Sequence, residues 1–579
     1  MSIPALLYPL VARADAPRDM ATGMRVWLDG LDVNGTDTGN GGGTNPVVGA
    51  QVTAWQDKSG RGLVAGDATS WGAVTHTYPK YAATGVNFDG VSNILEIPAG
   101  LYSTGEAVAA SEVFGVYLRR TSAKDSGYLF LNGPPGFSAL RQSFSYWYAG
   151  IYYDHFGPAT TGRAGTTYSA SNFAYNTMYV ENYNSSTMAG TVNFFRNGAS
   201  KAAGTTPEVY TQAAGHRFYI GGAESDNKSF LNGTISEFIA FSRTLNTAER
   251  NIMQSYLAAK HANPGGVGTA NRYTVTDGFR YHVGGIGQEA DGSLTTGTSA
   301  GLTISNGTFL GNGKYLLAGV ASLNPATGAV TVDAPTGFTH RSQRTWYVTR
   351  TGTGAGNVTM TFNPVQMGLA LKAGDNVALG FRSTNTGNFT ALSNVVYSGT
   401  GTISFTANNP QSGFYALAVP APTVAPALNL TLASQTVSDG VRASNFKLLP
   451  GAVLHVLATT TNSGDGSADT DSTVVSLPIA AGTKLFVGDL GAAGSGPVQF
   501  TQGVTASGLT YAYTSLGSTT DRLDFSNNSG ATWTYVPVPD AQQADAAVTN
   551  LRVRLGGAFA NNASPNFPSF TLKYALVVK

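Results

Sequence analysis

The chain has 579 residues, of which 42% are hydrophobic and 12% are charged, about half of the roughly 25% that soluble domains usually carry. This length indicates several domains, and the net charge of +1 provides no field that would attract nucleic acid or an anionic membrane. Cysteine is absent, which excludes disulfides and thiolate metal sites, and no apolar run reaches the roughly 20 residues of a membrane span.

The first 20 residues contain three prolines and are expected to be extended, without a stable helix. Several of their side chains would be costly to leave in water: Ile3, Leu6, Leu7, Leu10 and Val11. Two interpretations stay open. These residues pack on their own domain, or they add a strand to a neighbouring copy of the chain and so act as a self-assembly element.

Residues 21–262 are predicted to form one β-rich domain that is closed by a helix. Asn197-Gly198 is a hairpin signal. Asn246 and Glu249 have the spacing of a capping box, which predicts a helix that runs to about His261. The main strand-like segments between turn residues are 112–120, 127–132, 177–183, 191–198, 216–222 and 230–241.

An ordered set of motifs in this segment resembles bacterial laminin-G-like, concanavalin-A-like domains. At its start the motifs are Trp27-Leu28-Asp29, the run from Trp55 to Gly60, Pro79 and Phe88-Asp89-Gly90. At its end they are a Gly-x-Ile-x-Glu strand at 233–237 and a helix with Leu245, Glu249-Arg250, Tyr256-Leu257 and Lys260. The resemblance implies an antiparallel jelly-roll sandwich of an extracellular and often adhesive kind.

Two further β segments follow. Residues 269–420 contain KYLLAG at 314–319 and QRTWYVTRTGTGAGNVTMTF at 343–362, and they resemble the module that follows laminin-G-like domains in large bacterial surface proteins. A short proline-rich linker separates them from residues 427–579. There, 443–490 and 523–540 resemble the repeat domain of prokaryotic envelope proteins, which implies an immunoglobulin-like sandwich. The predicted fold class is therefore all-β: a concanavalin-A-like jelly roll and two smaller β-sandwich domains.

Two groups of side chains are candidates for binding. The glycine-rich stretch after Asp29 carries Asp32, Asn34 and Asp37, whose alternating oxygen ligands suit Ca²⁺, although side-chain-capped turns account for the same pattern. An aromatic stretch carries the second group, which could stack on sugar rings, although such residues are also common in cores and subunit contacts: Tyr146, Trp147, Tyr148, Tyr152 and Tyr153.

The sequence contains no zinc-protease, P-loop or dinucleotide-binding motif and no strand-borne pair of glycosidase carboxylates, so we expect no enzyme activity. We expect a secreted structural protein of a bacterial cell surface that self-assembles into a filament, surface layer or matrix and mediates adhesion. The alternative is a carbohydrate-binding adhesin that acts through the laminin-G-like domain, with Ca²⁺ as the one cofactor considered. Neither hypothesis includes a nucleic-acid partner.

Overall fold

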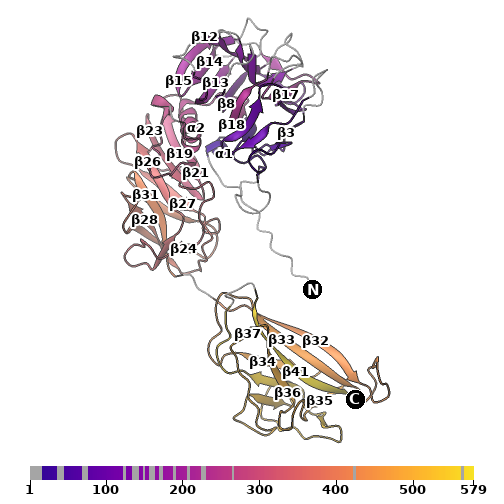
Figure 1. Ribbon diagram of the computed structural model, residues 1–579. Helices are drawn as coiled ribbons and strands as arrows, with labels where there is room; N and C mark the ends of the chain where they lie inside the picture. Colours follow the sequence, from indigo (N-terminus) through magenta and orange to yellow (C-terminus); the bar gives the residue numbers. More distant parts are fainter. Residues whose placement is uncertain are drawn as a thin grey trace. The chain divides into compact units, whose positions relative to one another are not determined.

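The computed structural model describes residues 16–35, 45–67, 76–120, 126–133, 142–147, 150–155, 163–167, 174–186, 191–204, 209–222, 230–263, 266–421, 425–561 and 566–579. The chain divides into two compact units, Met1–Pro422 and Thr423–Lys579, whose boundary falls in the predicted linker. Strands dominate both units (Figure 1), so the all-β prediction is confirmed. Among the described residues, no helix is both long and apolar enough to cross a membrane.

The N-terminal unit begins with a sandwich of two antiparallel sheets. In the first sheet the order is β15 (Ala199–Gly204), β14 (Thr191–Arg196), β13 (Met178–Ser186), β8 (Ala110–Arg119), β18 (Asn232–Phe241), β5 (Gly85–Asp89) and β4 (Lys80–Ala82), and β1 (Met24–Asp29) also pairs with β18. In the second it is β12 (Arg163–Thr167), β11 (Gly150–His155), β10 (Gln142–Trp147), β9 (Ser126–Gly133), β17 (Arg217–Ile220), β6 (Leu95–Ile97), β3 (Val64–Asp67) and β2 (Trp55–Gln56). A small pair, β7 (Ala107–Val108) and β16 (Tyr210–Thr211), lies apart from both.

Alternating apolar residues from both sheets fill the space between them, as the period-two pattern of the strands predicts. The rings of Phe130 and Phe218 each lie close to that of Phe238, with centroids 5.0 Å and 5.2 Å away. The hairpin signal is confirmed, because Asn197 and Gly198 join β14 to β15 with φ angles of 48° and 75°, as the tight turn requires.

A second sandwich completes this unit. One sheet has the order β20 (Gly292–Leu294), β19 (Tyr281–Glu289), β23 (Lys314–Val320), β26 (Trp346–Thr351), β31 (Gly413–Val419), β25 (His340–Ser342) and β24 (Ala329–Val330), with β28 (Asn376–Arg382) joining β31 to β29 (Thr390–Val396). The other has β21 (Thr296–Ser299), β22 (Leu302–Asn306), β27 (Asn357–Phe362) and β30 (Ile403–Asn408). Buried Trp346 packs edge-on against Phe362 in the core between them.

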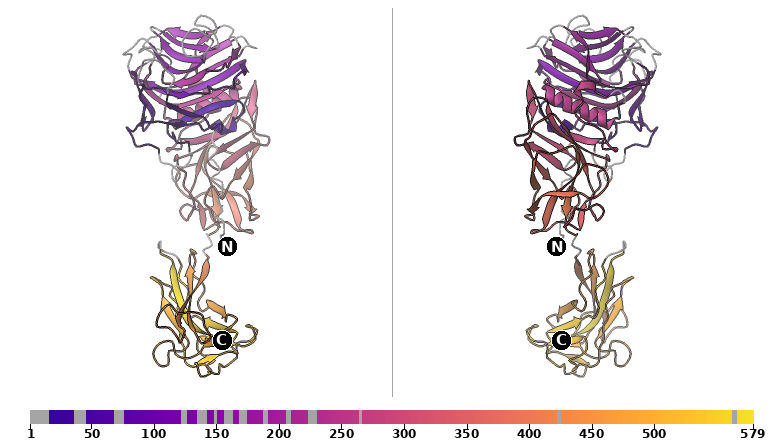
Figure 2. Two further views of the ribbon diagram at one scale, coloured as in Figure 1. Left: turned by 90° about the vertical axis from the view of Figure 1, so that its right-hand side faces the viewer. Right: turned by 90° about the vertical axis from the view of Figure 1, so that its left-hand side faces the viewer.

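Helix α2 (Thr247–Lys260) lies between the two sandwiches, as the right-hand view of Figure 2 shows. The predicted capping box is confirmed: the Asn246 side chain accepts from the Glu249 backbone N–H, and the Glu249 carboxylate accepts from that of Asn246. Twelve of the helix's fourteen residues are buried. The sequence predicted a helix that closes the first sandwich, but here both sides of the helix are covered.

One hydrophobic cluster runs through this junction. It joins Trp27 and Phe114 on the outer face of the first sheet, Ile252 and Tyr256 on α2, and Leu317 on β23 of the second sandwich. The segment that connects the two sandwiches also packs closely against the first one. Val267, just before the short 3-10 helix η1 (Gly268–Ala270), lies so close to Gly198 that a Cβ added to this glycine would be 2.1 Å from the Val267 carbonyl oxygen. The two sandwiches of this unit therefore share a core.

Residues 1–20 were predicted to be extended, and the described end of this segment, from residue 16, departs from that prediction. Residues Ala16–Asp19 form the short helix α1, with Pro17 in its first turn. Proline is compatible with that position because a first-turn N–H has no partner within the helix. Asp19 then reaches the second sandwich, where its carboxylate accepts from the backbone N–H and hydroxyl of Thr298 at 2.7 Å each.

The C-terminal unit is a separate sandwich. Its larger sheet has the order β32 (Leu428–Ser438), β33 (Val453–Asn462), β41 (Pro568–Val578), β35 (Thr483–Phe486) and β39 (Ala544–Asp545), with β36 (Val498–Gln502) and β37 (Thr505–Ala506) also on β41. Its smaller sheet has β34 (Val474–Pro478), β40 (Asn550–Arg554) and β38 (Leu523–Ser526). Its core includes Leu551, Phe559 and Phe570.

Candidate functional site

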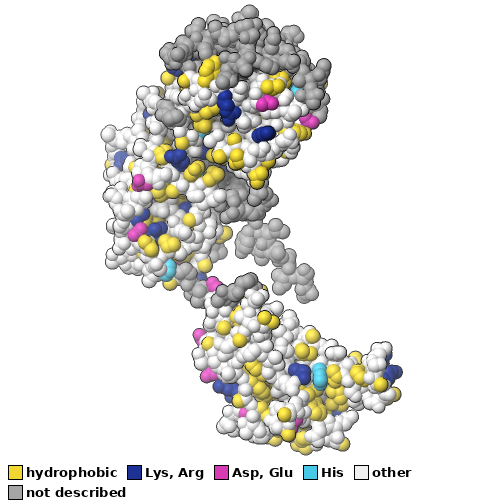
Figure 3. Space-filling model, viewed as in Figure 1, with side chains coloured by type: hydrophobic (Ala, Val, Ile, Leu, Met, Phe, Trp, Pro, Cys, Tyr) yellow, Lys and Arg dark blue, Asp and Glu magenta, His cyan; other side chains and the backbone are white. Residues whose placement is uncertain are grey.

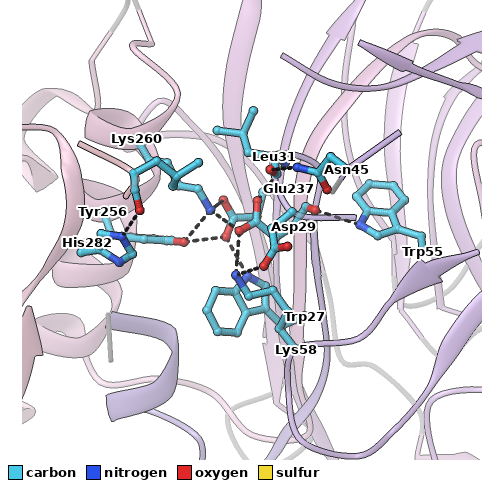
Figure 4. Close-up of polar contacts among 12 residues, drawn as sticks. Trp27, Asp29, Leu31, Asn45, Trp55, Lys58, Glu237, Tyr256, Lys260 and His282 are labelled. Carbon is cyan, nitrogen blue, oxygen red and sulfur yellow. Dashed lines mark hydrogen bonds and ion pairs between the residues drawn. The ribbon is translucent and has the colours of Figure 1, made fainter. Parts of the chain in front are cut away.

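A buried group of charged side chains lies between α2 and the first sheet (Figure 4). We call it the lysine–carboxylate cluster: Asp29 of β1, Lys58 after β2, Glu237 of β18, and Lys260 and His261 at the end of α2. Most of these residues belong to the motifs that resemble laminin-G-like domains. Motifs from both ends of the predicted domain therefore meet at one place in the fold.

Lys260 is at the centre of the cluster. Its Nζ lies 2.7 Å from Asp29 Oδ2 and 2.9 Å from Glu237 Oε2. Lys58 Nζ lies 3.0 Å from the same Asp29 oxygen, and His261 Nε2 lies 2.6 Å from Glu237 Oε2. Two aromatic residues complete the group, since Trp27 Nε1 and the Tyr256 hydroxyl donate to Glu237 Oε1 at 2.7 Å and 2.8 Å.

The electrostatic balance of the cluster favours the charged forms of its carboxylates. Its five members are between 0% and 9% exposed, and burial alone would raise the pKa of a carboxyl group. The ammonium groups of Lys260 and Lys58 outweigh burial at Asp29 and hold its pKa below the usual range. At Glu237 burial is outweighed mainly by Lys260, so the pKa of this carboxyl is also lowered.

This arrangement can hold the helix in one position. An ion pair this deeply buried adds little net stability relative to apolar residues of the same size, but removing one partner leaves an uncompensated charge inside the protein. The cluster therefore restricts where α2 can lie on the sheet.

The other end of α2 is held by a second buried carboxylate. Glu112 of β8 accepts from Arg250 Nε at 2.6 Å, from the Leu245 backbone N–H at 2.6 Å and from Asn182 Nδ2 at 2.9 Å. The side chain of Arg250 also donates to the Leu245 carbonyl oxygen at 2.7 Å. The first sheet thus binds the helix at both ends.

Polar contacts also join α2 to the second sandwich. Asn251 Nδ2 donates to the Tyr315 hydroxyl of β23 at 2.9 Å, and that hydroxyl donates to Glu289 of β19 at 2.6 Å. The Thr247 backbone N–H, in the first turn of the helix, donates to Asp291 at 2.9 Å. The helix is therefore bonded to both sandwiches by directional contacts as well as by apolar packing.

The predicted calcium ligands lie beside the lysine–carboxylate cluster. Asp32 Oδ2 lies 3.1 Å from Lys58 Nζ, Asn34 lies in the following turn, and Asp37 is outside the described residues. Within the described part of the chain, no group of three or more acidic, histidine or cysteine residues could hold a metal ion. The calcium site stays a prediction, with a lysine already bound to one of its three ligands.

The predicted aromatic site falls on β10 and β11. The register pairs Tyr146 with Ile151, Trp147 with Gly150 and Ser145 with Tyr152. Tyr148 is outside the described residues, as are Ile3, Leu6, Leu7, Leu10 and Val11 of the proposed self-assembly segment. The sugar-binding role of the aromatic residues stays a prediction.

One catalytic sequence pattern that the sequence analysis did not count is present. Gly297-Thr298-Ser299-Ala300-Gly301 has the spacing of a nucleophile elbow, which requires a strand, a sharp turn and then a helix. Here Ser299 ends β21, strand β22 follows, and the serine is 1% exposed. The pattern therefore lacks the strand–turn–helix geometry and the exposed serine that a nucleophile elbow requires.

The sequence analysis did not single out β32, which forms an edge of the larger C-terminal sheet and pairs with β33. Leu428, Leu430 and Leu432 lie on one face of it and are 48%, 44% and 58% exposed. The register pairs Leu430 with Thr460 and Leu432 with Ala458, both buried, so the leucines are on the core side of the sheet. The smaller sheet therefore leaves the core side of β32 uncovered. Charged side chains are sparse on the face of the molecule that Figure 3 shows.

Natural sheets usually protect their edge strands with charges, prolines or bulges. The eleven residues of β32, LNLTLASQTVS, contain no charged residue and no proline, and the one irregularity in the ladder lies near the far end, between Thr436 and Ser438. The edge is thus long, uncharged and apolar on one face. These features suit the edge to bind another strand.

Comparison with protein-family models gives no match. Comparison with curated proteins also gives none. Among solved structures, the chain is similar to Trypanosoma rangeli sialidase in complex with 2,3-difluoro-KDN, with 16% identity, a TM-score of 0.28, and coverage of 39% of this chain and 31% of that one. It is also similar to the CBM40 domain of Ruminococcus gnavus IT-sialidase bound to α2,3 sialyllactose, with 13% identity, a TM-score of 0.21, and coverage of 24% and 79%.

The chain thus spans less than a third of the length of the trypanosomal sialidase, and most of the length of the CBM40 domain. The first neighbour is a sialidase, and the second is a sialidase domain bound to sialyllactose. At these identities and TM-scores, the similarity supports no conclusion about what this chain binds or does.

Proposed function

We propose that this protein is a secreted structural protein of a bacterial cell surface that associates with copies of itself. The observation that carries the proposal is β32, the uncharged edge strand whose core-side leucines are uncovered. Such an edge offers unpaired backbone groups and an apolar surface to another strand. The low content of charged residues, 12%, supports the same proposal because little charge repulsion opposes association.

The N-terminal unit suits a structural role. Helix α2 and the shared hydrophobic cluster join its two sandwiches through packing and through hydrogen bonds on both sides of the helix. A joint of this kind resists bending better than a flexible linker does. We therefore propose that the unit acts as a rigid body in an assembly.

The test is the state of the full-length protein in solution. Sedimentation velocity from about 1 to about 50 µM, with negative-stain microscopy of the same samples, should show concentration-dependent dimers or larger assemblies. Particles that stay strictly monomeric over this range, with the protein folded by circular dichroism, would refute self-association.

A second candidate function is carbohydrate binding by the first sandwich. Its support is the aromatic stretch from Tyr146 to Tyr153 in the sequence, because aromatic rings stack on sugar rings and the neighbouring Asp154 is a residue type that bonds to sugar hydroxyls. A glycan array with the full-length protein, with and without a calcium chelator, tests it. Binding that Trp147→Ala and Tyr152→Ala abolish would support the candidate, and no binding under either condition would remove it.

A further inference from the structure

The free edge of β32 carries regularly spaced backbone groups. In an antiparallel ladder, alternate residues direct both their N–H and C=O groups toward the same neighbour. The Ser463 backbone N–H donates to the carbonyl oxygen of Ala427 at 2.9 Å, which continues the ladder of β32 and β33 by one residue and shows that odd-numbered residues face β33. The even-numbered residues, which include the three leucines, therefore present their backbone groups to the open edge.

We infer that the strand that binds this edge is β32 of a second copy, in antiparallel orientation about a two-fold axis. This inference rests on the proposed self-association and names its contact. When an axis perpendicular to the sheet relates two strands, each face of one sheet continues into the same face of the other. The core-side leucines of both copies then form one continuous apolar row.

Among the registers in which two copies of β32 can pair, the one centred on Leu430 brings the most leucine side chains opposite one another. Leu430 then lies opposite Leu430 of the second copy, and Leu428 lies opposite Leu432 of that copy. All three residues are even-numbered, so each of these pairs exchanges backbone hydrogen bonds across the junction. No charged residue lies between Leu428 and Ser438, so the strand can meet itself without like-charge repulsion.

The apolar N-terminal segment fits the same edge less well. Pro4 and Pro9 are separated by an odd number of positions, so in a regular strand their backbone nitrogens face opposite sides. One of the two prolines would then fall where an N–H must be donated to the edge, and proline has none. The strand of a second copy has no such defect.

Three variants of the full-length protein test the inference by sedimentation velocity. Leu430→Lys and Leu430→Glu each place two like charges opposite one another at the axis, and each should weaken dimerisation at least about tenfold. An equimolar mixture of the two should restore it, because residue 430 then meets the opposite charge. Leu392→Lys is the matched control, since Leu392 of β29 is a similarly exposed leucine, at 53%, away from this edge.

A cysteine at the axis gives an independent readout. The chain has no cysteine, and hydrogen-bonded residues in opposing strands have Cα atoms about 5.5 Å apart, within the range of about 4.4–6.8 Å that a disulfide spans. Leu430→Cys should therefore form a disulfide-linked dimer on mild oxidation, whereas Leu392→Cys should not.

The outcomes separate the inference from the proposal beneath it. A monomeric wild-type protein would overturn both. Wild-type association that Leu430→Lys and Leu430→Glu leave unchanged would overturn the β32 contact and keep self-association. Association that these variants weaken, but that mixing them does not restore, would show that β32 binds some other strand. Loss of association on deletion of residues 2–12 would then identify that strand as the N-terminal segment.

Discussion

Replacement of Lys260 by methionine tests the role of the lysine–carboxylate cluster. Lys260 is 5% exposed and its ammonium group lies within 3 Å of carboxylate oxygens of both Asp29 and Glu237. Methionine fills a similar volume without the charge, so the change acts mainly on electrostatics. Asp29 keeps Lys58 and Glu237 keeps its contact with His261, but each loses the ammonium group of Lys260.

Breaking a buried ion pair by removing one partner typically costs about 3–5 kcal/mol. We expect a loss of this size, which at about 2 °C per kcal/mol for a large domain lowers the melting temperature of the N-terminal unit by roughly 6–10 °C. Scanning calorimetry resolves that transition, and Trp27, bonded to Glu237, provides a local fluorescence signal. The control is Lys372→Met at an exposed lysine, which should shift melting by less than about 1 °C.

The double variant Glu237→Gln, Lys260→Met sharpens the test. It removes a negative charge together with the positive one, so its loss of stability should fall short of the sum of the two single losses by about 1 kcal/mol or more. Additive single losses, or a Lys260→Met protein as stable as the Lys372→Met control, would refute the view that these charges compensate one another.

Three further predictions concern the junction of the N-terminal unit. Gly198→Ala should destabilise the N-terminal unit by about 1 kcal/mol more than Gly60→Ala. Both glycines have positive φ, but a Cβ added at 198 would clash with Val267, whereas a Cβ added at 60 would meet open space. Equal melting temperatures of the two variants would contradict this prediction. Asn246→Ala should cost about 0.5–2 kcal/mol through loss of the helix cap, measured as a lower melting temperature. Burial raises the pKa of Asp19 from about 4 to about 7, so the folded state holds this proton more tightly, and its contribution to stability should fall as pH rises from about 4 to 7. Asp19→Asn should remove that slope in melting temperature, and an unchanged slope would assign it to other groups.

Local patterns were sufficient to predict most elements of the fold. The hairpin at Asn197-Gly198 and the capping box at Asn246 are encoded within a few residues, and the strand-like segments between turn residues include β8 and β13. The short helix α1 was missed because the three prolines of the first 20 residues were taken to exclude a helix, although Pro17 occupies a first-turn position that tolerates proline.

The site was harder to predict because its contacts join distant parts of the chain. Asp29 and Lys260 are 231 positions apart, and nothing local to either indicates the pairing. Lys260 looked like a cation placed at a helix C-terminus, where exposed lysines are common. The edge strand β32 did carry a readable signal, because leucines alternate with polar residues over a stretch without charge. The sequence could not show that the smaller sheet of the C-terminal unit ends before it covers these leucines.

The burial of α2 on both sides has a practical consequence for work with fragments. A recombinant piece that stops near residue 263 would keep the helix but strip away the strands that cover half of it, and a piece that starts near residue 266 would lack the helix on which β19 and β23 rest. Either piece should expose apolar surface, so we expect it to aggregate and to be susceptible to proteases. Recombinant versions of this region, and any transplantation of it into another protein, should therefore keep α2 together with both sandwiches of the N-terminal unit.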